Sequence, residues 1–133
     1  FMAWQKYIIH NASAEMQEYC DVETNPVQKL KMVVEYKIKY FEKNKTTIKG
    51  YMQNNQLFLR GISRRKEHPM AKAYNYCAGI IKDLKPMEDN DAYLLAVIFD
   101  GIINSYIECS LENDNLFEKQ DEIMERFLRL VGV

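Results

Sequence analysis

The stretch that decides the fold is residues 90–111, with the sequence NDAYLLAVIFDGIINSYIECSL. Its apolar residues recur at three- and four-residue spacing without any proline, which predicts a long α-helix. An ordinary surface helix has a single apolar stripe. One side of this helix carries Leu95 and Phe99. Another side carries Leu94 and Val97, so the helix has to be covered on two sides.

Two arrangements would provide the second cover. In a chain of 133 residues, it can come from another subunit. The alternative is a central helix wrapped entirely by its own chain. The pattern of residues 90–111 alone does not choose between these arrangements.

The remaining sequence also has the spacing of helices. Asn25-Pro26-Val27-Gln28 is typical of a helix start, with asparagine as the N-cap and proline in the first turn. Gly132 stands where a C-terminal cap belongs. Five predicted helices cover residues 1–19, 26–43, 69–84, 90–111 and 116–131. Residues 45–62 are predicted as one further helical region, a short helix with a break near Asn54-Asn55 before a second short helix. We therefore predict a single all-α domain over residues 1–133, a bundle of about five to six helices.

Composition and charge favour a soluble globular protein. Hydrophobic residues make up 47% and charged residues 28% of the chain, and the formal net charge of −1 points to neither nucleic acid nor an anionic membrane. The longest apolar run, residues 92–107, is interrupted by Asp100 and Asn104. It is also shorter than the ~20 residues that a membrane span needs. We expect no membrane partner.

The three cysteines are set far apart in apolar helical patterns. Cys20, Cys77 and Cys109 are odd in number, which favours free thiols in a reducing compartment over a disulfide framework. No secretory signal is visible at the start of the sequence. We therefore expect a cytoplasmic protein.

Signals of catalysis are weak. His10 and His68 are not at metal-ligand spacing with each other or with a cysteine. No glycine-rich phosphate loop or nucleophile elbow is present. The basic turn at residues 64–66 contains too few charges to indicate a nucleic-acid site. We predict no enzyme activity, no catalytic residues, no metal and no cofactor.

Several segments, taken in order, resemble the TetR family of bacterial transcription regulators. Residues 25–30 (NPVQKL), with 40–44 (YFEKN) at the other end of the same helix, resemble the family's fifth helix. Residues 96–102 (AVIFDGI) are similar to its eighth helix, which has a glycine in its middle. Residues 118–133, ending FLRLVGV, resemble its ninth and final helix. Each motif is degenerate, and the resemblance depends on their order and spacing over the whole chain.

This resemblance implies a dimer and a missing domain. The last two helices would pair with those of a second copy as a four-helix bundle. The expected interface comprises Leu94, Val97, Gly101, Asn104, Ile123, Phe127 and Leu130. The family's N-terminal helix-turn-helix is absent from the sequence, so the chain is either a fragment or a naturally headless relative. We favour a fragment, which would contact DNA only through the missing domain. The full protein would be a regulator, taken to be a repressor, controlled by a small molecule.

The resemblance also places an effector pocket among the helices. Lys37 lies in an apolar arc, and Glu15 lies between Trp4 and Ile8 on the first helix. Buried charges are costly unless they are paired. The two either pair structurally, or Lys37 extends to solvent, or both orient a small apolar or aromatic effector. The expected pocket residues are Trp4, Ile8, Asn11, Glu15, Lys37, Tyr40, Phe41, Tyr76, Ile80, Phe99 and Ile103. The alternative function is a helical homodimeric interaction module without a ligand.

Overall fold

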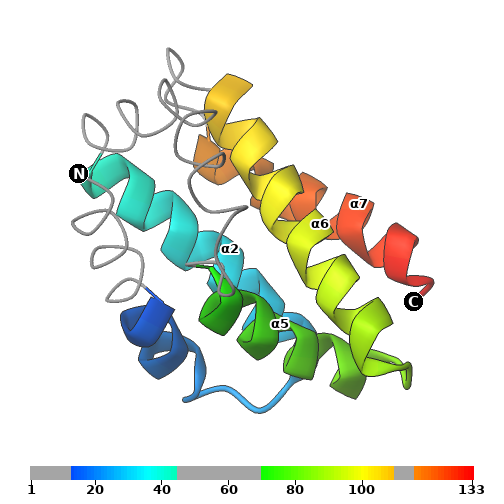
Figure 1. The fold of residues 1–133 in the computed structure, drawn as a ribbon. Helices are drawn as coiled ribbons and strands as arrows, with labels where there is room; N and C mark the ends of the chain where they lie inside the picture. Colours follow the sequence, from blue (N-terminus) through cyan, green and yellow to red (C-terminus); the bar gives the residue numbers. More distant parts are fainter. Residues whose placement is uncertain (1–12, 45–69, 110–115) are drawn as a thin grey trace, which may run out of the picture.

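A computed structural model describes residues 13–44, 70–109 and 116–133, and every regular element in these ranges is helical (Figure 1). Residues 13–20 form a helical segment, followed by α2 (Pro26–Lys43), α5 (Ala71–Leu84), α6 (Asp89–Cys109), the short 3₁₀ turn η1 (Leu116–Lys119) and α7 (Gln120–Val131). The predicted all-α fold is confirmed. The helices predicted within residues 1–12 and 45–62 lie outside the described residues.

Helix α2 begins as its sequence predicts. The side chain of Asn25 accepts a hydrogen bond from the backbone N–H of Gln28 at 3.1 Å, and Pro26 occupies the first turn, where its missing N–H is not needed. At the other end, the backbone N–H of Asn44 donates to the carbonyl oxygens of Tyr40 and Phe41. Both ends of α2 are therefore closed by local contacts.

The end of α7 also follows the prediction. Gly132 has a φ of 88°, in the left-handed region that glycine enters without steric cost, and its N–H donates to the carbonyl of Leu128 at 3.0 Å. Three predicted starts differ from the structure. Helix α5 starts at Ala71 rather than residue 69, and α6 starts at Asp89 rather than residue 90. The segment predicted as a helix from residue 116 opens with a 3₁₀ turn.

Helices α5 and α6 form an antiparallel hairpin, and α7 runs back alongside α6 (Figure 1). Helix α2 packs against α5, α6 and α7, so its buried face lies at the centre of the described core. Phe99 of α6 and Phe127 of α7 are in contact there, with ring centroids 4.4 Å apart. Leu30, Ile38 and Phe41 of α2 complete this apolar centre.

Among the described helices, α6 is long and apolar enough, by length and composition alone, to cross a membrane. Core helices of soluble proteins meet the same two criteria. This property does not by itself assign α6 to a membrane.

Candidate functional site

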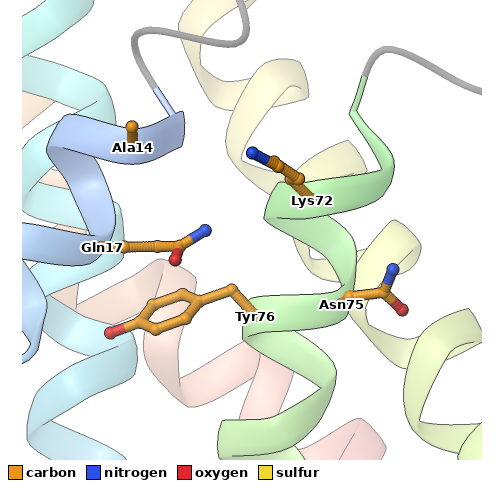
Figure 2. A pocket seen from close by; sticks show the side chains of 5 residues that line it. All are labelled: Ala14, Gln17, Lys72, Asn75 and Tyr76. Carbon is orange, nitrogen blue, oxygen red and sulfur yellow. The ribbon is translucent and has the colours of Figure 1, made fainter.

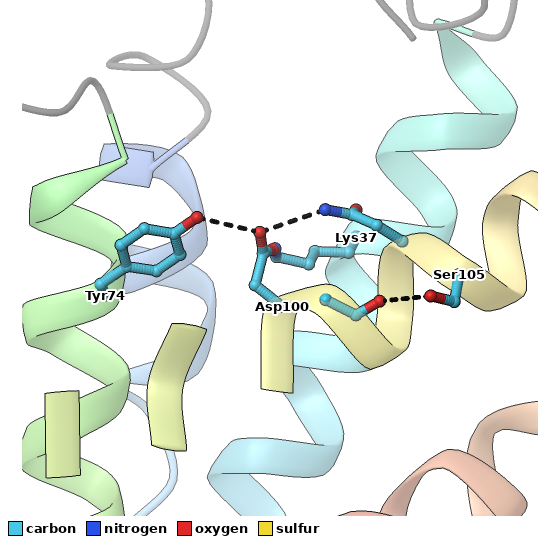
Figure 3. Close-up of polar contacts among 6 residues, drawn as sticks. Lys37, Tyr74, Asp100 and Ser105 are labelled. Atoms are coloured by element: carbon cyan, nitrogen blue, oxygen red, sulfur yellow. Dashed lines mark hydrogen bonds and ion pairs between the residues drawn. The ribbon is translucent and has the colours of Figure 1, made fainter. Parts of the chain in front are cut away.

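A polar cluster interrupts the apolar core where α2, α5 and α6 meet (Figure 3). Its centre is Asp100, which is 8% exposed and lies on the buried face of α6. Asp100 forms an ion pair with the Lys37 ammonium of α2 through its Oδ1 atom. Its Oδ2 atom accepts hydrogen bonds from the Tyr74 hydroxyl of α5 at 3.3 Å and from the Asn104 amide at 3.1 Å. One carboxylate therefore joins side chains from three helices.

Lys37 and Asp100 are largely removed from water, with side chains 17% and 11% exposed. Burial lowers the pKa of the Lys37 ammonium to about 8, because it disfavours the charged form. The pKa nevertheless stays above neutral pH, and the ammonium has the Asp100 carboxylate as its ion-pair partner. We conclude that Lys37 carries its charge at neutral pH and that Asp100 balances it.

The partner of Lys37 is not the one considered from the sequence. Glu15 is exposed on the segment 13–20, and its Oε2 atom accepts a hydrogen bond from the Tyr36 hydroxyl at 2.8 Å. The structural pair between Lys37 and Glu15 does not form, because Asp100 takes that place. The signal for Asp100 was in the sequence: it shares the helical face of Ala96 and Ile103, which are both buried.

The structure distributes the expected pocket residues among different environments. Trp4, Ile8 and Asn11 lie outside the described residues. Phe41, Ile80, Phe99 and Ile103 are packed into the core and are at most 4% exposed. Tyr40 and Tyr76 are half-buried: Tyr40 stacks against Tyr36, and the Tyr76 hydroxyl donates to Asp21 at 2.7 Å. The described part of this set therefore forms mainly packed core rather than one continuous wall.

A separate hollow of about 400 Å³ lies between the segment 13–20 and α5 (Figure 2). It is lined by Ala14, Gln17, Lys72, Asn75 and Tyr76. Only Tyr76 was expected in a pocket. Gln17, Lys72 and Asn75 were missed because polar residues on amphipathic helices are ordinarily solvated. Ala14 was missed with them, because helical periodicity does not reveal which two exposed faces approach each other.

The expected dimer residues fall into two groups. Leu94, Gly101 and Asn104 of α6 and Leu130 of α7 are exposed, and Val97 is half-buried. Ile123 and Phe127 are fully buried within the chain itself. Their assignment to an outer surface is wrong for this structure. They belong to the apolar stripe of α7, and α2 and α6 already cover that stripe.

Two of the three thiols are buried, and all three are free. Burial raises the pKa of Cys20 to about 12 and that of Cys77 to about 11. The thiolate is the nucleophilic form of cysteine. Cys20 and Cys77 are therefore held in the unreactive thiol form at neutral pH.

No protein-family model, no curated protein and no solved structure matches this chain. The resemblance to TetR-type regulators stays a prediction, and its functional consequences have to be argued from the residues described above.

Proposed function

We propose that this chain is the ligand-sensing and dimerising part of a TetR-type transcriptional regulator. The observation that carries the proposal is that α6 has apolar residues on two opposite faces, one buried and one exposed. The DNA-binding helices of such a regulator would lie upstream of residue 1. The effector would be a small, largely apolar or aromatic molecule.

The two faces of α6 differ sharply in exposure. Ala96, Phe99 and Ile103 face the core and are at most 1% exposed. On the opposite face, Leu94 is 58% and Ile98 is 38% exposed. Residues spaced by three and four share a helix face, so Gly101 continues this second stripe. Leu94 and Ile98 are neighbours on this face, and exposed apolar side chains that lie together favour cover by a second copy.

Helix α7 also has an exposed apolar residue, at its C-terminal end. Figure 1 shows the C-terminal end of α7 beside the beginning of α6. Leu130 is 59% exposed there. The middle of α7 carries the charged pairs Glu125–Arg129 and Glu122–Arg126. We infer that α6 supplies most of the apolar area and α7 supplies a charged border.

The ligand-sensing half of the proposal is supported by the Lys37–Asp100 cluster. Lys37, Asp100 and Tyr74 are polar groups within an otherwise apolar core, and their contacts link three helices. A molecule that bound one packing of these helices more tightly than another would shift the balance between them. Sensing requires this difference in affinity.

A second function, a homodimeric interaction module without a ligand, is favoured by one observation. Phe41, Phe99 and Ile103, which would have formed a pocket wall, are packed in the core. This function shares the exposed face of α6 but not the sensing step. Effector binding separates the two proposals, whereas dimerisation tests what they share.

The dimer is tested by sedimentation velocity at micromolar concentration, with Gly101→Arg compared with Gly79→Arg. Both glycines are exposed, and neither has any atom within 4 Å of where a Cβ would lie. The arginines should therefore cost the two monomers similar amounts of stability. We expect a dimer for the unmodified chain and for Gly79→Arg, and a monomer for Gly101→Arg. A monomeric unmodified chain would contradict the proposal.

A further inference from the structure

We infer that the hollow between the segment 13–20 and α5 binds a small aromatic monocarboxylate. The inference rests on the proposed function only in taking this molecule to be the effector. The volume of the hollow, about 400 Å³, lies at the lower end of the range of small-molecule sites. Three features of its lining define the chemistry of the ligand: a cation, an amide and an aromatic ring.

The cation and the amide face the hollow from opposite walls. Figure 2 shows the Lys72 ammonium pointing from α5 toward the segment 13–20, and the Gln17 amide pointing back toward α5. Among the described residues, Lys72 has no ion-pair partner. An ammonium and an amide N–H both donate hydrogen bonds, so one carboxylate can accept from both. A single ammonium matches a single negative charge.

The aromatic ring of Tyr76 is held in place by its own hydrogen bond. Its hydroxyl donates to Asp21 at 2.7 Å and points away from Lys72 (Figure 2). The Asp21 carboxylate therefore lies at the hydroxyl end of the Tyr76 ring, away from the Lys72 ammonium. Burial and the bond to Asp21 raise the pKa of Tyr76, which keeps the hydroxyl neutral. A neutral, fixed ring offers a stacking surface for a second aromatic ring.

Shape completes the assignment. Ala14 contributes only a methyl group to its wall, which leaves room for a flat ligand between Gln17 and Lys72. The amide of Asn75 points away from Gln17, so it adds a polar edge rather than a further donor to the centre. A planar ring over Tyr76, with its carboxylate between Lys72 and Gln17, uses each of these groups.

The test is an NMR titration of the isotopically labelled 133-residue chain with sodium benzoate at constant ionic strength. We expect saturable shifts of backbone amides confined to residues 14–17 and 72–76. Benzyl alcohol, which lacks the charge, and acetate, which lacks the ring, should each bind at least about tenfold more weakly, since each loses one of the two contacts. Equal binding of benzoate and benzyl alcohol, or shifts centred elsewhere, would overturn the inference.

Matched variants locate the contact. Lys72→Gln should weaken benzoate binding about tenfold, whereas Lys82→Gln should leave it unchanged, because Lys82 lies about 15 Å further along the same helix. Tyr76→Phe keeps the ring and should retain binding. Equal affinities of Lys72→Gln and Lys82→Gln would overturn the assignment. Sedimentation of the same samples keeps the two proposals separate, since a monomer that binds benzoate would contradict only the proposed function.

Discussion

The Asp100 carboxylate is buried in an otherwise apolar face of α6 and has three polar partners. A buried charge without a partner costs several kcal/mol, whereas a compensated pair can be replaced by apolar groups at little cost. The stability of the core therefore depends on keeping Lys37 and Asp100 together rather than on either charge alone.

Asp100→Asn tests this dependence. The variant keeps the volume of the side chain but leaves the Lys37 ammonium without its counter-charge. We expect a loss of about 2–3 kcal/mol in the free energy of unfolding, somewhat below the range for fully buried pairs, because Lys37 retains some contact with water. Urea denaturation, monitored by circular dichroism, measures this loss.

The double variant Lys37→Met/Asp100→Asn should recover most of the loss, since neither charge remains. Asp91→Asn, at an exposed position of the same helix, is the control and should cost less than about 1 kcal/mol. An Asp100→Asn variant as stable as this control would show that the ion pair does not matter to folding.

The buried thiol of Cys77 predicts a loss of stability at alkaline pH. Its pKa is about 11 in the folded chain against an ordinary value of 9.0. A raised pKa means that the folded state keeps its proton longer than the unfolded state does. The stabilisation is complete below pH 9 and is lost as the pH rises toward 11. At pH 10 the loss from this group is about 1 kcal/mol.

Comparison with Cys77→Ala, under reducing conditions, isolates this effect. The variant is less stable at every pH because of the cavity that it creates. Its stability should nevertheless fall less steeply between pH 8 and 10 than that of the unmodified chain, and the other titrating groups are common to both proteins. Parallel curves would mean that the thiol of Cys77 is not shielded in the folded state.

At the level of single residues, the sequence predicted part of the site. Lys37 stood out because one charged residue in an apolar helical arc needs a partner. Its partner could not be identified, because the contact with Asp100 depends on how α2 crosses α6, and periodicity within one helix carries no information on crossing. The hollow at Lys72 was missed for the same reason.

Helix ends were predictable where a side chain or a glycine closes them. Asn25 and Gly132 mark ends that the structure confirms. The start of α5 was less accurate, since its N-cap residue, Met70, makes no side-chain capping bond. The 3₁₀ turn before α7 was also unexpected, because three- and four-residue spacings are similar over a single turn.

The capping bond of Asn25 can be measured directly. Asn25→Ala removes the acceptor for the N–H of Gln28 and should lower the free energy of unfolding by about 1 kcal/mol. Thr24→Ala, at the adjacent exposed position, should change it by less than about 0.5 kcal/mol. Thermal and urea unfolding of the two variants provide the comparison. Equal losses would show that Asn25 does not act through its cap.

At the level of the whole molecule, the proposed dimer links stability to concentration. A partner that binds only the folded chain raises its unfolding temperature as protein concentration increases. The unmodified chain should show this rise over a hundredfold range of concentration. The double variant Leu94→Ser/Ile98→Ser should not, because it removes apolar area from the exposed face of α6.

Val22→Ser is the matched control for this experiment. Val22 is 82% exposed and lies in the connection before α2, not on α6. It should keep the full concentration dependence. Loss of the dependence in both variants, or its absence from the unmodified chain, would contradict the dimer.

The ion pair between Lys37 and Asp100 also determines how α6 is rotated about its own axis. A helix with apolar residues on opposite faces could pack in more than one rotational setting, since contact between apolar groups has no preferred direction. Sliding the sequence by one residue turns every side chain by about 100°. In any such setting Asp100 would lose Lys37, and two charges would be left without partners. The pair therefore favours the one orientation of α6 in which Leu94 and Ile98 face outward.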